Sequence, residues 1–409
     1  MNRSIDTRKF DLLLLILGLI VLAAGLIFAL TAKKINLHKK TTLVFTQWWQ
    51  DEMDAGTLSA LKTEFETLNP DITIRLDNRP YAEILSALRS NGESPLKSDI
   101  LGLDPLWFEE QALQDFLEPL DTYDATTPSW GRPLVFFTSH LFYNIELLQS
   151  VGFDRPPKNR AEVLTYARAV TDTSAGRYAL ALALSPENPR GVYRDIFSWI
   201  WASGAKPDFS ASAITGVLTF LQQLHREELL LPGTFSKTEA EKREDFIKGR
   251  AVMMIASVAD IPVLRERMGE NAGGQTFGLT LVPPGESSSG GKPVLGLTGW
   301  YLGIPRSAAH KDEAWAFLSF LLERSALVAE KAHAVPGSRN NVTDFITDDP
   351  LYAKAYDMYT AGETVREFTG VPRLDEFEAM VREQIYALFE KDQSPEETAK
   401  YIQQYWEEL

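Results

Sequence analysis

The stretch that decides the fold is residues 43–76, LVFTQWWQDEMDAGTLSALKTEFETLNPDITIRL. Its first five residues are typical of a strand, and DITIRL at its end alternates apolar and polar residues as a second strand does. Between them, residues 57–69 place apolar side chains at intervals of three and four, which predicts an amphipathic helix. These side chains are Leu58, Leu61, Phe65 and Leu68. Strand, helix and strand in this order predict a βαβ unit with a parallel sheet and a right-handed crossover.

Two adjacent tryptophans, Trp48 and Trp49, follow the first strand. Neighbouring side chains of an extended chain point to opposite faces, so both indoles cannot enter one core. A helix over residues 81–89 and a strand over residues 99–103 come next, and Asp104 follows that strand. Ligands of open α/β sheets bind outside the carboxyl ends of the strands, which is where the tryptophans and Asp104 are expected.

The rest of the chain continues as a mixture of strands and helices. Residues 134–144 are extended and apolar, and helices are predicted near 161–171 and 192–202. Residues 277–305 predict a strand, a Pro/Gly/Ser-rich loop and a further strand. The C-terminal part predicts an amphipathic helix around residues 377–389 and a capping box at residues 394–397.

Composition excludes several functions. The chain has 409 residues, enough for two lobes, and a net charge of −15, which argues against nucleic acid as a partner. It has no cysteine, and its five histidines lie far apart, so neither a metal site nor a cofactor is expected. No Walker loop, dinucleotide fingerprint, HExxH or GxSxG occurs, so an enzyme is not expected. A glycosidase with an acid pair remains an alternative.

The N-terminus predicts a membrane segment. Residues 12–32 contain no charge and would span about 30 Å as a helix, one hydrocarbon core. Residues 1–11 would form a cytoplasmic segment and residues 33–42 a basic linker. A transmembrane anchor or uncleaved signal is favoured over a removed signal peptide, because small residues suited to cleavage are poorly placed. Basic residues flank the segment on both sides, so charge does not decide its orientation.

The order of segments resembles the solute-binding receptors of bacterial ABC importers, in the branch that contains maltose-binding protein. The resemblance covers residues 43–409 and depends on LVFTQWWQ, SDILGLDPLWFEEQALQDFLEPLD, LFYNIELLQSVGFDRPPKNRAEVLTYARAV, FIKGRAVMMIASVADI, FGLTLVPPGES, GLTGWYLGIP and SPEETAKYIQQYWEEL. Ser98 replaces the usual proline before the third strand, and Arg160 replaces the usual tryptophan after the proline pair.

The resemblance implies an α/β, two-lobed periplasmic binding protein fold (type II-like) with interlobe hinge strands, preceded by the N-terminal transmembrane helix. Lobe 1 would combine residues 43–136 and 287–322, and lobe 2 would combine residues 140–282 and 328–409. The chain would cross between the lobes near residues 136–139, 282–286 and 322–328. A ligand would be enclosed in the cleft by hinge closure.

The resemblance also implies ligand-binding residues, each weighed against ordinary packing. Sugars are held by aromatic rings on their C–H faces and by polar groups on their hydroxyls. The candidates are Trp48, Trp49, Asp51, Asp104, Trp107, Tyr193, Arg194, Ser257, Asp260, Trp300, Tyr301 and Arg339.

The resemblance and the uncharged N-terminal segment together imply a monomeric, membrane-tethered receptor that faces the periplasm or cell exterior and delivers a carbohydrate to ABC permease subunits. Asp51, Asp104 and Asp260 keep a polyamine or another small solute as an alternative. A membrane-anchored ligand sensor is the other alternative.

Overall fold

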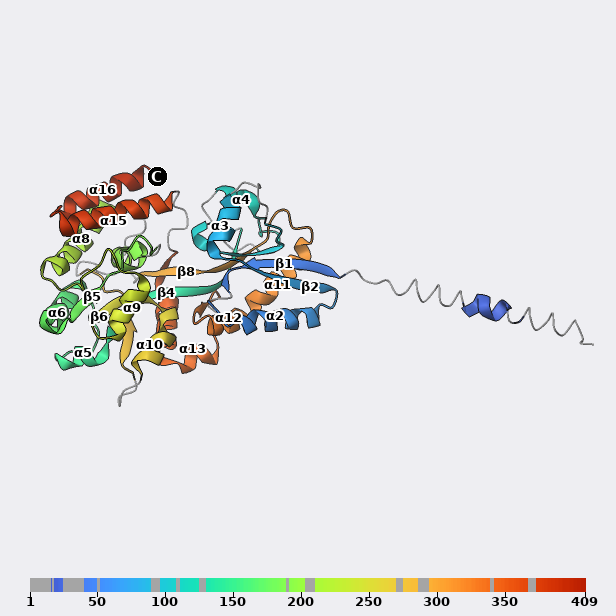
Figure 1. Ribbon diagram of the computed structural model, residues 1–409, viewed down its shortest axis with the longest axis horizontal. Coiled ribbons are helices and arrows are strands. Elements are labelled where there is room, and N and C mark those ends of the chain that lie inside the picture. The colour runs from blue at the N-terminus through green and yellow to red at the C-terminus, as the bar shows by residue number, and fades with distance from the viewer. Residues whose placement is uncertain are drawn as a thin grey trace, which may run out of the picture.

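The computed structural model describes residues 16, 18–24, 40–49, 52–89, 96–107, 111–124, 130–188, 191–202, 210–269, 275–285, 294–338, 342–366 and 373–409. Its strands follow one continuous path, in the order β2-β1-β3-β8-β4-β6-β5, from one half of the molecule to the other. Helices cover this sheet in both halves, and β4 and β8 run between them (Figure 1). The mixed α/β, two-lobed architecture predicted from the sequence is confirmed.

The predicted βαβ unit is present in the first half. β1 (Thr41–Gln47) pairs in parallel with β2 (Ile72–Asn78) along its whole length, and α2 (Ala55–Leu68) connects the two strands. Of the apolar stripe predicted for α2, Leu58, Leu61 and Phe65 face the core, whereas Leu68, the last residue of the helix, is 62% exposed. β1 also pairs in parallel with β3 (Ile100–Leu103), so the carboxyl ends of these two strands lie at one edge of the sheet.

β4 (Arg132–Asn144) belongs to both halves because it changes partner part-way along. Up to Thr138 it pairs antiparallel with β8, and from Ser139 onward it pairs antiparallel with β6 and then β7. The change falls within residues 136–139, where the sequence predicted a crossing between lobes. β3 and β10 also pair with β8, β9 with β4, and β5 with β6. These strands are β5 (Tyr178–Ala181), β6 (Ala251–Ser257), β7 (Phe277–Thr280), β8 (Val294–Gly303), β9 (Val335–Pro336) and β10 (Glu363–Arg366).

The helices divide between the halves and the region where they meet (Figure 1). Around the first half and this region lie α3 (Tyr81–Arg89), α4 (Gln111–Phe116), α11 (Lys311–Glu323), α12 (Ser325–Lys331), α13 (Asp344–Asp348) and α14 (Pro350–Ala361). The second half contains α5 (Ile145–Ser150), α6 (Arg160–Val170), α7 (Ser198–Trp201), α8 (Ala211–Arg226), α9 (Glu239–Ile247), α10 (Ile261–Met268), α15 (Leu374–Glu390) and α16 (Pro395–Glu407). Short 3₁₀ turns cover Pro105–Trp107, Thr173–Ala175 and Val258–Asp260.

The buried apolar side chains form two large clusters, one centred in each half. The first surrounds Phe45 and Phe317, and the second surrounds Phe197 and Val381. The first cluster continues into the second half, where it includes Phe277 of β7. The exact limits of the two lobes therefore remain predictions.

Two local expectations have a clear outcome. The helix expected over residues 192–202 is a π-helix at Tyr193–Phe197 followed by α7, rather than one α-helix. Ser394 caps α16 as predicted, because its hydroxyl accepts a hydrogen bond from the N–H of Glu397 at 3.1 Å. Of the predicted membrane segment, the structure describes residues 16 and 18–24. Within the described chain, none of the helices has the length and apolar character needed to cross a bilayer.

Candidate ligand-binding site

A cavity of about 1140 Å³ lies between the two halves and is lined by residues from both. The first half contributes the loops after β1 and β3 and the start of α3. The second half contributes the π-helix, α9, the turn after β6 and the start of α15. The crossing strands β4 and β8 supply its base. Small-molecule sites commonly measure about 300–1000 Å³, so this cavity can hold a ligand at the upper end of that range.

Trp48, Tyr81 and Trp107 form an aromatic wall at the carboxyl edge of β1 and β3. Their ring centroids lie 4.9 to 5.3 Å apart. Nε1 of Trp107 donates a hydrogen bond to the hydroxyl of Tyr81 at 2.8 Å, and this hydroxyl donates to Oδ2 of Asp104 at 3.2 Å. The wall is therefore a fixed apolar surface that ends in a carboxylate.

The base of the cavity is built where β8 crosses β4. Trp300 lines the cavity and stacks on Trp49, with ring centroids 4.8 Å apart and an interplanar angle of 12°. Phe137 of β4 meets Trp300 edge to face at 5.3 Å. A Cβ at Gly299 would lie 2.4 Å from the carbonyl oxygen of Val135, so only glycine permits the two strands to approach this closely.

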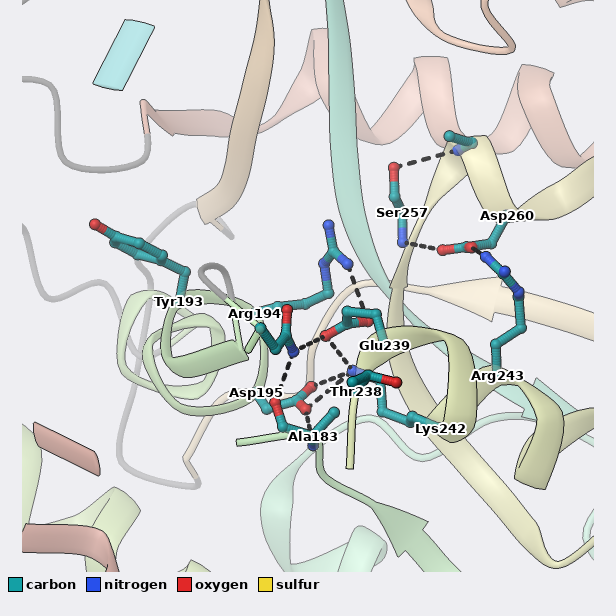
Figure 2. Close-up of polar contacts among 12 residues, drawn as sticks. Ala183, Tyr193, Arg194, Asp195, Thr238, Glu239, Lys242, Arg243, Ser257 and Asp260 are labelled. Atoms are coloured by element: carbon teal, nitrogen blue, oxygen red, sulfur yellow. Dashed lines mark hydrogen bonds and ion pairs between the residues drawn. The ribbon is translucent and has the colours of Figure 1, made fainter. Parts of the chain in front are cut away.

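Arg194 and Glu239 form a charged wall on the opposite side (Figure 2). Nη1 of Arg194 lies 3.0 Å from Oε2 of Glu239. Oε1 of Glu239 accepts hydrogen bonds from Nδ2 of Asn188 at 3.1 Å and from Nζ of Lys242 at 3.0 Å. Burial alone would raise the pKa of Glu239, but Lys242 and Arg194 oppose burial and lower this pKa to about 2. Glu239 is therefore an ionised acceptor at neutral pH.

A second ion pair joins α9 to the turn after β6. Nη1 of Arg243 lies 2.6 Å from Oδ1 of Asp260. Oδ2 of Asp260 accepts a hydrogen bond from the N–H of Ser257 at 3.1 Å, and the hydroxyl of Ser257 accepts one from the N–H of Ala259 at 3.2 Å. The turn and the arginine together fix the Asp260 carboxylate and balance its charge.

The start of α15 forms another side of the cavity. Nε of Arg373 donates to Oε2 of Glu376 at 3.0 Å, and both residues line the cavity. Nη2 of Arg89, at the end of α3, lies 3.9 Å from Oδ2 of Asp375. This long ion pair joins the two halves across the cavity. No group of His, Cys, Asp and Glu in the described part of the chain could hold a metal ion.

The structure brings together most of the residues predicted from the sequence. Those that line the cavity are Trp48, Asp104, Trp107, Tyr193, Arg194, Ser257, Asp260 and Trp300. Trp49 and Tyr301 are fully buried outside the lining. The reason at β8 is the alternation of side chains along a strand, which turns Tyr301 away from the face that presents Trp300. Asp51 and Arg339 lie outside the described residues.

Sequence reasoning missed several lining residues that the site uses. They are Tyr81, Arg89, Phe137, Glu239, Arg243, Arg373, Asp375 and Glu376. A signal for α9 was present. The T-x-x-E pattern at residues 238–241 is a complete capping box in the structure, so a helix could have been predicted there. Glu239 and Arg243 are four residues apart and would then share one helix face.

Two α/β halves that share strands and enclose a cavity define a two-lobed ligand-binding protein. The description "Bacterial extracellular solute-binding protein" matches residues 45–326, and the chain belongs to this family. A binding protein of Brucella abortus (strain 2308) is 24% identical over 286 residues, which cover 64% of this chain and 68% of the relative. The family predicted from the sequence is thereby confirmed.

Solved structures show the same fold. The sugar-binding protein MalE of Xanthomonas citri has a TM-score of 0.71 and 19% identity, and the match covers 90% of this chain and 97% of the other. The GacH receptor of Streptomyces glaucescens, studied in complex with acarbose, has a TM-score of 0.68, 19% identity and coverage of 90% and 98%. UgpB of Mycobacterium tuberculosis, in complex with glycerophosphocholine, has a TM-score of 0.72, 16% identity and coverage of 90% and 98%.

Proposed function

We propose that this protein is a receptor that binds a sugar or oligosaccharide in the cavity and delivers it to the permease of an ABC importer. The observation behind the proposal is the pairing of the aromatic wall, Trp48, Tyr81 and Trp107, with a wall of fixed donors and acceptors across the cavity. Aromatic rings match the apolar C–H faces of a sugar, and fixed polar groups match its hydroxyls. No catalytic step is proposed for this chain.

Three ion pairs among the residues that line the cavity favour a neutral ligand. Arg194 is paired with Glu239, Arg243 with Asp260, and Arg373 with Glu376. These pairs offer N–H donors and carboxylate acceptors side by side. A neutral polyol can use both kinds of group without breaking a pair, whereas a cation or an anion would compete with one partner.

The polyamine alternative loses support from the same geometry. It depended on convergence of Asp51, Asp104 and Asp260. Asp260 is already paired with Arg243, and Asp104 accepts a hydrogen bond from Tyr81. Asp51 lies outside the described residues. A polyamine or a phosphodiester therefore serves as a comparison ligand in the test rather than as a second proposal.

The uncharged segment at residues 12–32 supports an anchor that tethers the receptor to the membrane, with the binding lobes on the outer side. An extracellular location agrees with the family. We further propose that the receptor works as a monomer, because one chain supplies both walls of the cavity. Fractionation of cells that make the full chain, before and after protease treatment from outside, tests the anchor and its orientation.

Thermal unfolding of residues 41–409 with sugars, polyamines and phosphodiesters tests the proposed function. A ligand present at a hundred times its Kd should add about 2.7 kcal/mol to the free energy of unfolding. The expected result is a rise in Tm with one class of sugar, reduced by Trp48→Ala. Stabilisation by polyamines alone, or by no sugar, would contradict the proposal. A matched hydrolysis assay on chromogenic glycosides separates binding from a glycosidase activity.

A further inference from the structure

A fully buried ion pair lies directly beneath the charged wall (Figure 2). Nζ of Lys242 lies 2.7 and 2.9 Å from the two carboxylate oxygens of Asp195, and the side chains are 1% and 0% exposed. Neither residue is among those that line the cavity in the described structure. The pair therefore cannot contact a ligand, and any effect it has on binding must act through other residues.

The ammonium of Lys242 connects two elements that do line the cavity. It donates to both oxygens of Asp195 in the π-helix and, at 3.0 Å, to Oε1 of Glu239 in α9. A lysine ammonium has three N–H donors, so these three contacts can account for all of them. Asp195 is held from its other side, because its Oδ2 also accepts a hydrogen bond from the N–H of Ala183 at 2.6 Å.

We infer that Lys242 is a positioning residue for ligand binding, which fixes the Glu239 carboxylate and, through Asp195, the π-helix that presents Tyr193 and Arg194 to the cavity. The inference rests on the proposed function of this cavity. Stability alone does not require the pair, since buried ion pairs can often be replaced by apolar residues of similar volume without loss. The charge of Lys242 is used instead to hold two ligand-facing elements in one arrangement.

Lys242 also favours the ionised forms of the two carboxylates that it contacts. It is the leading cation that opposes burial and depresses the pKa of Glu239. Burial raises the pKa of Asp195, and the same ammonium opposes that rise. One lysine therefore stabilises a carboxylate on the π-helix and a carboxylate on α9.

The test uses the double variant Asp195→Asn/Lys242→Met in the full chain. The single change Lys242→Met would leave an unpaired buried carboxylate and can prevent folding, whereas the double variant removes both charges and keeps an oxygen for the N–H of Ala183. The matched control is Lys237→Met/Asp245→Asn. That pair is 2.7 Å apart beside the same helix, its aspartate is 1% exposed, and neither residue lines the cavity.

Affinity for the sugar that stabilises most is measured by tryptophan fluorescence at pH 7.5. We expect the native protein and the control to bind equally well. The double variant should bind about tenfold more weakly. Unchanged affinity would reduce the pair to a packing role and overturn the inference.

A measurement without ligand separates this inference from the proposed function. If no sugar binds, the proposed function fails, and hydrogen exchange then tests the positioning of the π-helix. In the ligand-free double variant, amides of residues 191–202 should exchange at least tenfold faster than in the native protein, and the control should match the native protein. Equal exchange in all three proteins would overturn the inference independently of any ligand.

Discussion

The two adjacent tryptophans should respond differently to truncation, because Trp48 lines the cavity and Trp49 supports its base from the core. Trp48 is 7% exposed and packs against Tyr81 and Trp107 in the aromatic wall. Trp49 is fully buried and stacks on Trp300. We therefore expect both substitutions to lower stability, but only Trp48→Ala to lower ligand affinity strongly, while Trp49→Ala leaves most of the affinity intact.

The size of each effect follows from burial. Truncation of a buried tryptophan costs about 3–5 kcal/mol. With an unfolding entropy of about 2.1 cal/mol/K for each of roughly 370 residues, Trp49→Ala should lower Tm by about 4–6 °C. A ligand at a hundred times its Kd should raise the Tm of the native protein by about 3–4 °C. If Trp48→Ala weakens binding tenfold, the same ligand concentration should raise its Tm by only about 2 °C.

Calorimetry of the native protein and both variants, each with and without the best sugar, measures these shifts in one experiment. Isothermal titration checks the affinities directly. The geometric reasoning would be refuted if Trp49→Ala lost the ligand-induced rise while Trp48→Ala retained it. A small baseline change for Trp49→Ala would also count against the stacked, buried position of its indole.

Three further predictions concern backbone, pH and charge. Gly299→Ala should destabilise the protein by about 1–3 kcal/mol, because the added Cβ would meet the carbonyl oxygen of Val135. Gly216→Ala should instead stabilise it by about 0.5–1 kcal/mol, because Gly216 is helical and the nearest atom to its added Cβ, Nη1 of Arg160, is 3.7 Å away. Urea unfolding compares the two variants. Burial, with a smaller contribution from a nearby lysine, lowers the pKa of His140 to about 3, so the unfolded chain binds a proton that the native state does not. As the pH falls from about 6 to about 4, this histidine should therefore lower the free energy of unfolding by about 1.4 kcal/mol per pH unit. His140→Gln should flatten that part of the profile of Tm against pH. The depressed pKa of Glu239 means that this carboxylate stays ionised until the pH falls toward 2, so Glu239→Gln, which removes the charge, should reduce the affinity measured by titration at pH 7 about tenfold.

The first half of the fold could be predicted from sequence because local periodicity and burial agree there. Apolar residues recur every three or four positions within residues 57–69, and this segment forms most of α2, with Phe65 in the core. The π-helix could not be predicted in the same way. Its residues satisfy a helical apolar pattern, and the contact of Asp195 with Lys242 joins residues 47 positions apart, which a local pattern does not reveal.

The aromatic side of the site was more predictable than the charged side. Trp48, Asp104 and Trp107 follow strands directly, and the rule that ligands bind at the carboxyl edge of a sheet places them correctly at the cavity. Trp49 was misplaced because the alternation rule shows that two adjacent rings differ but does not show which one turns inward. Glu239 and Arg243 were missed because acids and bases on a charged helix are usually solvated, and only tertiary packing brings these two to the cavity.

The contrast between the two walls indicates how ligand would drive closure. The halves are joined across the mouth of the cavity by Arg89 and Asp375, whose side chains are 51% and 84% exposed and whose charged atoms are 3.9 Å apart. An exposed pair at this distance is weak and screened by salt, so it cannot hold the closed form alone. A ligand that stacks on the wall of Trp48 and also hydrogen-bonds to Glu239 contacts both halves at once, and only such a ligand favours the closed state over the open one. A sugar meets this requirement because each face of its ring is apolar while its edge is polar, whereas a purely apolar or purely charged solute would engage one wall and leave the hinge at β4 and β8 free.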